Sequence, residues 1–193
     1  MVIRKLFKAE MAHAVPFAYS KRCRHLHGHS YKFELFLKGH FPNPAHMVTD
    51  FKAVKDTGIA DFFDSFDHAV MLWEKDPRAS LLKKINPERF IRVPFIPTAE
   101  MMAKAFFHVS RAILETGPRL SGEKGARVDS VIVHETDTGS ARFGETDLVG
   151  DSFPDVRFDR WIISPGIRAD WKVKTWVPKV AAYFKEAANG KRT

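Results

Sequence analysis

A cluster of side chains that commonly bind metals lies between residues 23 and 31. It contains Cys23, His27 and His29, with Gly28 between the two histidines. Residues two apart on a β-strand project from the same face, so the two imidazoles can converge on one ion. Gly28 leaves the opposite face bare and permits close packing there. The spacing predicts that His27 and His29 bind one divalent metal.

A third ligand has to come from another part of the chain, and His13 is the candidate. It lies on the preceding predicted strand, where a hairpin could bring it opposite the pair. Three imidazoles with one open position are typical of catalytic zinc, whereas the single cysteine excludes a Cys-rich structural site. The alternative is that these are ordinary surface or core histidines. We treat the other histidines as non-ligands, although His25 would share the alternation if the strand began earlier; they are His25, His40, His46, His108 and His134.

Cys23 is the only thiol in the chain. It lies four residues before His27, in a segment that also contains Lys21, Arg22 and Arg24. Positive neighbours favour the thiolate form, which suits a general base or a nucleophile. The alternative is an inert buried cysteine.

Two further carboxylates could take part in chemistry. Asp67 precedes His68, and a carboxylate beside an imidazole can fix its tautomer, although such a pair is usually only solvated. Glu135 ends a predicted strand and could accept two hydrogen bonds from an amidine-like ring edge. It could equally be an ordinary strand-end carboxylate.

The elements that position these residues follow from the periodicity of the apolar side chains. Helical spacing predicts one helix that begins near Thr49 and Asp50, and a longer one between Pro97 and Gly117. The order strand, strand, helix, helix, strand, strand predicts an α+β fold, with a four-stranded antiparallel sheet and two helices on one face. The strands predicted from two-residue alternation are 2–15, 27–38, 127–135 and 140–143.

Two stretches lie outside this scheme. Residues 76–97 contain four prolines and are expected to form a loop with a short helical turn. We divide the chain into a domain over 1–147 and an extension over 148–193 that contains Trp161, Trp171 and Trp176. The extension is expected to end in a helix over 178–188 and to pack on its own domain or on a neighbouring subunit.

The composition is that of a folded protein. The chain has 193 residues, 45% of them apolar, and 17 are Phe. It has no apolar run long enough to span a bilayer and no signal-like N-terminus, and one cysteine fits a reducing compartment, so a cytoplasmic location is expected. The net charge of +8 favours anionic partners, either nucleic acid or a phosphorylated small molecule, unless it only makes the surface basic.

The residues described above resemble the 6-pyruvoyl-tetrahydropterin synthase family. The resemblance covers residues 1 to about 145, and Cys-x-x-x-His-Gly-His is its most specific part. The gap of three residues between the cysteine and the histidine pair resembles the spacing in the branch of the family that forms 6-carboxytetrahydropterin. The matching segments are Ala12-His13, Cys23 to His29, Met47-Val48-x-Asp50-Phe51, Asp67-His68, Pro97-Thr98-Ala99-Glu100 and His134-Glu135-Thr136.

The resemblance implies a fold, an assembly and a site. The fold is the tunnelling fold, or T-fold, whose subunits form barrels with sites at their interfaces, here as a tetramer or a hexamer. The implied roles are zinc binding by His13, His27 and His29, general base catalysis by Cys23 with Asp67 and His68 as its proton-handling partners, and substrate binding by Glu135 with Thr98 nearby.

The implied reaction converts 7,8-dihydroneopterin triphosphate to 6-carboxy-5,6,7,8-tetrahydropterin, with release of acetaldehyde and triphosphate, on a route to queuosine and other deazapurines. One alternative is another pterin side-chain enzyme, such as 6-pyruvoyl-tetrahydropterin synthase or an aldolase. A second is a basic zinc-containing module that binds nucleic acid, but the interleaved basic and aromatic surface it would need is not evident. We therefore expect a small-molecule substrate and a homo-oligomer, with neither nucleic acid nor membrane as a partner.

Overall fold

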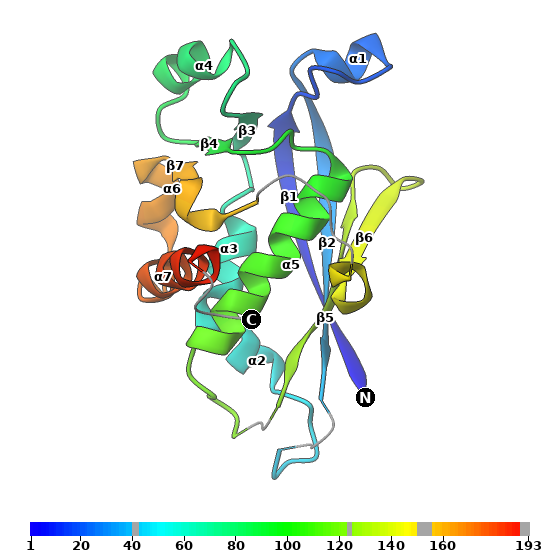
Figure 1. Ribbon diagram of the computed structural model, residues 1–193, viewed down its shortest axis with the longest axis vertical. Helices are drawn as coiled ribbons and strands as arrows, with labels where there is room; N and C mark the ends of the chain where they lie inside the picture. Colours follow the sequence, from blue (N-terminus) through cyan, green and yellow to red (C-terminus); the bar gives the residue numbers. More distant parts are fainter. Residues whose placement is uncertain (40–42, 123–124, 150–155, 190–193) are drawn as a thin grey trace.

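The computed structural model describes residues 1–39, 43–122, 125–149 and 156–189. Within these residues, seven strands form one sheet in the order β6-β5-β2-β1-β3-β4-β7 (Figure 1). The strands are β1 (Val2–His13), β2 (His27–Lys38), β3 (Val70–Trp73), β4 (Phe90–Val93), β5 (Arg127–His134), β6 (Ser140–Gly144) and β7 (Ile162–Ile163).

The antiparallel half of the sheet matches the prediction. β1 and β2 pair without interruption from Val2↔Lys38 to His13↔His27, β5 pairs with β2, and β6 pairs with β5. Alternation sends Ala9, Met11 and His13 into the protein, while the residues between them face outward. The predicted α+β class, with four antiparallel strands, is confirmed.

The other half of the sheet was not predicted. β3 pairs parallel with β1, β4 pairs parallel with β3, and β7 adds an antiparallel edge. The expectation that 76–97 is a loop with one helical turn was therefore wrong for Phe90–Val93. The prolines favoured a loop in the prediction, but Pro87 and Pro94 lie on either side of this strand and do not interrupt it. Within the strand, Phe90, Ile91 and Val93 are all buried.

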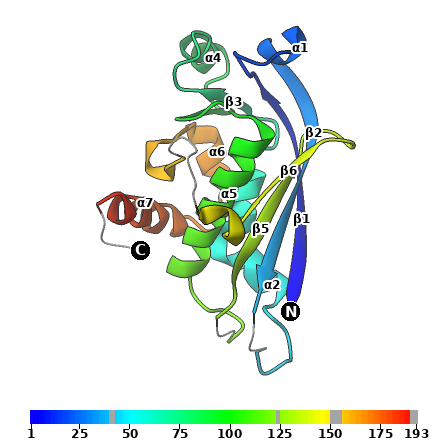
Figure 2. The ribbon, with the colours of Figure 1, turned by 45° about the vertical axis from the view of Figure 1, so that its right-hand side comes forward.

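The helices α3, α5, α6 and α7 lie on one face of the sheet, whereas α1 lies at one end of it (Figure 2). In the described residues, no helix combines the length and the apolar character needed to cross a bilayer. The α-helices are α1 (Lys21–Arg24), α2 (Phe51–Val54), α3 (Ala60–Asp64), α4 (Ala79–Ile85), α5 (Ala99–Thr116), α6 (Pro165–Asp170) and α7 (Trp176–Ala188). A π-helix, η1 (Lys55–Ile59), joins α2 to α3, and two 3-10 helices are η2 (Glu145–Leu148) and η3 (Phe158–Arg160).

The core lies between the sheet and the long helix α5. Thr98 begins this helix by accepting a hydrogen bond from the N–H of Met101 through its side chain. Phe106 on α5 packs face to face with Phe66, at 4.5 Å between ring centroids, and edge to face with Phe33 of β2. Apolar burial of this kind is the main stabilising term in the fold.

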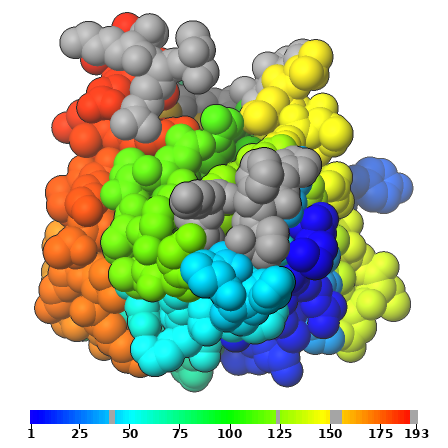
Figure 3. Space-filling view, turned by 90° about the horizontal axis from the view of Figure 1, so that it is seen from below, coloured from blue at the N-terminus to red at the C-terminus, as the bar shows by residue number. Residues whose placement is uncertain are grey.

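The C-terminal extension packs on the helical layer of its own chain (Figure 3). Trp171 donates through Nε1 to the Ser65 hydroxyl at 2.8 Å. Trp176 lies against Gly58, which has a φ of +102°, and a Cβ at Gly58 would be 2.3 Å from Trp176 Cδ1. Gly58 thus permits both the left-handed backbone and the close approach of the indole.

Candidate metal centre

The three predicted ligands converge at one end of the β1–β2 pair. His13 lies opposite His27, and His29 lies two residues further along β2, opposite Met11. Each histidine offers one nitrogen, and these three nitrogens lie within 4.8 Å of one another. His13 is fully buried, whereas the other two are half-buried. The strand pairing alone therefore brings the predicted ligands together.

Two backbone carbonyls fix the tautomers of this cluster. Nδ1 of His13 lies 2.7 Å from the carbonyl oxygen of Pro97, and Nδ1 of His27 lies 2.8 Å from that of His25. A carbonyl can only accept, so in each neutral ring the proton is on Nδ1 and the lone pair is on Nε2. The two Nε2 atoms are 3.1 Å apart. Two lone pairs facing each other at this distance favour a shared cation.

His29 supplies the third donor. Its Nε2 atom is buried and has no hydrogen-bond partner among the residues that the structure describes. Burial lowers the pKa of His29, and this outweighs the opposite effect of Glu135, so the neutral, metal-binding form is favoured. Nitrogens on one tetrahedral zinc, each at about 2.0–2.1 Å from the ion, are roughly 3.4 Å apart. An orphaned nitrogen beside two converging ones fits such an ion with little adjustment.

Glu135 and Tyr31 lie beside these nitrogens. Glu135 Oε1 is 3.2 Å from His13 Nε2 and 3.9 Å from His29 Nε2, and it accepts a 3.4 Å hydrogen bond from the Tyr31 hydroxyl. The contact with His13 holds the pKa of Glu135 below its ordinary value and outweighs the opposite effect of partial burial. Burial and the negative charge of Glu135 both raise the pKa of Tyr31. Tyr31 is therefore a neutral donor at the site.

Cys23 belongs to the short helix α1 and is partly buried. Its backbone carbonyl accepts a hydrogen bond from the N–H of Val15, 2.8 Å away, which ties α1 to the segment that follows β1. The charge of Cys23 is one of the contributions that raise the pKa of Tyr31. The Tyr31 hydroxyl in turn lies 3.1 Å from His13 Nε2.

Asp67 and His68 form a pair of their own. Nδ1 of His68 is 2.9 Å from Asp67 Oδ2, and Asp67 Oδ1 accepts the backbone N–H of Glu10. Burial alone would raise the pKa of Asp67, but these hydrogen bonds outweigh it, and the pKa lies below its ordinary value. His68 lines a pocket with Glu10 and Ser30 on the outer face of the sheet. Among the hydrogen bonds and ion pairs of the described residues, none joins this pair to Cys23 or to the three histidines of its own chain.

The remaining site residues show what sequence reasoning could and could not find. The Thr98 side chain caps α5, while the neighbouring Pro97 carbonyl orients His13. His25 contributes its carbonyl and not its ring. The sequence cannot indicate which backbone carbonyls contact the site, because every residue has one. Tyr31 could have been identified, because it continues the two-residue alternation of His27 and His29.

Comparison with known proteins identifies the family. Residues 2–146 match the family model described as 6-pyruvoyl tetrahydropterin synthase. The chain belongs to this family. It is 31% identical to a Helicobacter pylori protein named 6-carboxy-5,6,7,8-tetrahydropterin synthase, over 96% of this chain and 94% of that protein. A Haemophilus influenzae protein of the same name is 30% identical, over 74% of this chain and 98% of that protein. The first match therefore includes most of the C-terminal extension.

Solved structures share the fold. An uncharacterized protein from Wolinella succinogenes has a TM-score of 0.62 at 23% identity, covering 75% of this chain and 98% of that one. The 6-pyruvoyl tetrahydropterin synthase of Caenorhabditis elegans has a TM-score of 0.51 at 16% identity, covering 75% of this chain and 94% of that one. The T-fold of the subunit is confirmed, and the sheet of the single chain is open.

Proposed function

We propose that this protein is a zinc-dependent lyase that converts 7,8-dihydroneopterin triphosphate and one water to 6-carboxy-5,6,7,8-tetrahydropterin, acetaldehyde and triphosphate. The observation that carries the proposal is the convergence of three imidazole nitrogens, two of them with their lone pairs directed inward by backbone carbonyls. The names of relatives that match this chain over most of its length support the choice of substrate. The product would serve queuosine and deazapurine synthesis.

Each group has a proposed task. His13, His27 and His29 hold the metal and leave one coordination position for substrate. Zinc, when bound, polarises hydroxyl and carbonyl oxygens of the substrate side chain. Cys23 takes a proton from that side chain as general base.

The substrate has its own set of contacts. Glu135 accepts hydrogen bonds from the amino-bearing edge of the pterin, and Thr98 serves as an auxiliary contact. The basic side chains around Cys23, which include Lys21, Arg22 and Arg24, favour the triphosphate.

We further propose a homo-oligomer, a tetramer or a hexamer. The support is that, among the described residues, no hydrogen bond or ion pair joins Asp67 and His68 to Cys23 within one chain. Sites at subunit interfaces would let the pair of one chain act with the thiol of another. We also propose a cytoplasmic location, because the one cysteine is unpaired and an unpaired cysteine suits a reducing compartment.

The test is a turnover assay with a chelator control. Purified protein is incubated with 7,8-dihydroneopterin triphosphate, with and without a chelator, and the products are identified by mass. We expect 6-carboxytetrahydropterin and acetaldehyde in equal amounts, loss of both with chelator, and recovery when zinc is restored. A pyruvoyl product without acetaldehyde would assign the protein to the other branch of the family. Turnover at the same rate with and without the chelator would overturn the metal-dependent mechanism.

A further inference from the structure

The helix that carries Cys23 cannot hold itself in place. α1 has only four residues, none of them buried, and it has no side-chain cap at its N-terminus. A single helical turn is unstable in water because the cost of nucleating it is not recovered by further turns. The position of the thiol therefore depends on contacts from outside α1.

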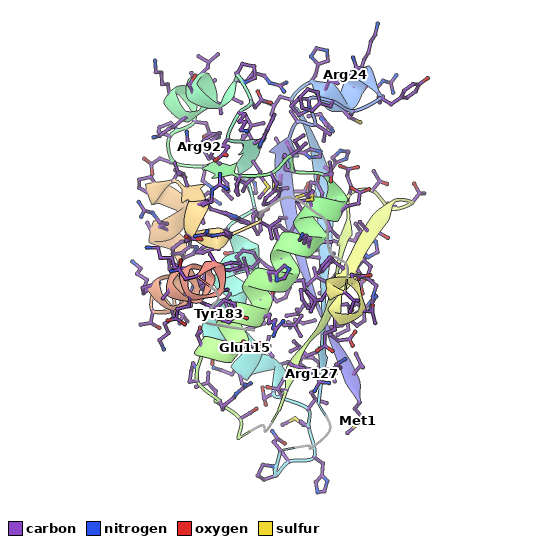
Figure 4. All side chains as sticks on the ribbon, in the orientation of Figure 1. Met1, Arg24, Arg92, Glu115, Arg127 and Tyr183 are labelled. Carbon is purple, nitrogen blue, oxygen red and sulfur yellow. The ribbon has the colours of Figure 1, made fainter. Side chains whose placement is uncertain are left out.

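Some of these contacts come from the adjoining segment. The guanidinium of Arg24, the last residue of α1, donates to the carbonyl oxygens of Ala18 at 2.6 Å and of Tyr19 at 3.3 Å. Together with the bond from Val15 to Cys23, they close a local loop. All of these partners lie between residues 15 and 24 of the chain. Figure 4 labels Arg24 at the end of the molecule that carries α1. Such a loop needs an anchor in the rigid part of the fold.

Arg78 supplies that anchor from 54 residues away. Its Nη1 donates to the carbonyl oxygen of Arg24 at 2.8 Å. The rest of its guanidinium is held by Asp76, with Nε–Oδ1 at 2.8 Å and Nη2–Oδ2 at 2.6 Å. This bidentate geometry fixes the plane of the guanidinium, and therefore the direction of the third hydrogen bond.

Asp76 is anchored in turn. Its side chain is fully buried, whereas that of Arg78 is 31% exposed. Its backbone N–H donates to the carbonyl of Trp73, the last residue of β3, at 3.0 Å. Burial opposes ionisation of Asp76, but the hydrogen bonds from Arg78 outweigh it and hold the pKa of the carboxyl below its ordinary value. The chain of contacts thus runs from the sheet through Asp76 and Arg78 to the residue next to Cys23.

We propose that Asp76 and Arg78 form a positioning pair that fixes the Cys23 thiol relative to the metal centre. The inference rests on the proposed role of Cys23 as general base. It also gives a function to part of the 76–97 segment, because the turn after β3 then supports the reactive thiol. Figure 1 shows that this turn, between β3 and α4, lies at the same end of the molecule as α1.

The test variant is Arg78→Lys, which keeps the charge but cannot form the bidentate pair and the third bond together. Arg157→Lys is the matched control. Arg157 also forms a two-bond pair with a nearly buried aspartate two residues away, Asp159, and its side chain is 33% exposed, but it lies in the C-terminal extension. Both variants are compared with the unchanged protein for zinc content, thermal unfolding, kcat and KM. Amide exchange of residues 14–26 is followed as well.

We expect Arg78→Lys to keep its zinc and its KM while kcat falls roughly 10- to 100-fold, because small displacements of a reacting group cost about this much. The Val15 amide should exchange faster, and iodoacetamide should alkylate the single thiol severalfold faster in alkaline buffer, where both proteins carry the thiolate. Arg157→Lys should change none of these. Equal exchange, alkylation and kcat in the two variants would overturn the proposal.

The exchange and alkylation measurements separate this inference from the proposed function. If the unchanged protein does not turn over the pterin triphosphate, the proposed function fails. Faster exchange and alkylation in Arg78→Lys alone would still show that Arg78 positions Cys23. If the unchanged protein is active but Arg78→Lys has normal kcat and normal protection, the positioning role fails and the proposed function stands.

Discussion

Nδ1 of His13 lies 2.7 Å from the carbonyl oxygen of Pro97, a residue 84 positions later in the chain. This contact directs the lone pair of His13 toward the other two histidines. It also links the metal centre to the start of α5, because Thr98 caps that helix. The Pro-Thr-Ala-Glu segment therefore supports the proposed metal ligand His13 through its backbone, in addition to any contact that the Thr98 side chain makes with substrate.

The metal centre predicts different outcomes for two neighbouring histidines. His27→Ala removes a ligand and should weaken zinc binding by more than about 100-fold, since even the loss of an outer contact costs 10- to 100-fold. His25→Ala should bind zinc normally, because His25 contributes only its backbone carbonyl. Competition with a chromophoric chelator measures both affinities. Equal losses would mean that the ring of His25 is a ligand.

The interface hypothesis predicts complementation between inactive variants. Cys23→Ala and His68→Ala should each be inactive alone, but after mixing under conditions that exchange subunits they should recover about a quarter of normal activity, because each site draws its two halves at random. Each variant taken alone through the same subunit-exchange procedure serves as the control. If the mixture stays inactive although mass spectrometry shows mixed oligomers, Cys23 and His68 do not act across an interface.

Gly58 is predicted to be the least replaceable of the left-handed glycines. Gly58→Ala should destabilise the fold by about 2–5 kcal/mol, since it adds backbone strain to a clash with Trp176. Gly125→Ala is the control: its φ is +73° and no atom of the described residues beyond its chain neighbours lies within 4 Å of an added Cβ, so only strain remains, at about 1–2 kcal/mol. Urea unfolding of both variants measures the difference. An equal loss of unfolding free energy in the two variants would show that a side chain at position 58 does not clash with Trp176.

The sequence was most informative where the structure is local or periodic. Two-residue alternation places the histidines and the antiparallel pair β1–β2, because every side chain on a half-buried strand must face the core or water. The strands β3, β4 and β7 are too short for alternation to identify them, and their pairing joins distant segments.

The site shows the same division. The convergence of the three histidines could be predicted, because residues two apart on a strand and opposite one another on a hairpin share a face of the sheet. The carbonyls of Pro97 and His25 could not, since every residue has one. The Asp76–Arg78 pair is equally hidden, because its importance depends on the carbonyl of Arg24, which only the folded chain brings near.

The Asp76–Arg78 pair predicts how stability depends on pH. The folded pKa of Asp76 lies below its ordinary value of 3.8, so its ionised form stabilises the protein above that pH, and the contribution is lost as the pH falls through the folded pKa. Asp76→Asn should therefore cost about 2 kcal/mol near neutrality, and less below about pH 4. Urea unfolding of both proteins in chelator from pH 3 to about 7 measures this. A difference that stays constant with pH would show that the cost is not ionic.

Zinc K-edge X-ray absorption of the purified, zinc-loaded protein tests the central claim most directly. Our account predicts a four-coordinate ion with three imidazole nitrogens and one oxygen at about 2.0–2.1 Å. The same spectrum is predicted for Cys23→Ala, because the thiol is placed beside the metal and not on it. A sulfur scatterer at about 2.3 Å that disappears in Cys23→Ala would contradict the account, since the thiol would then be a ligand and the open coordination position would be lost.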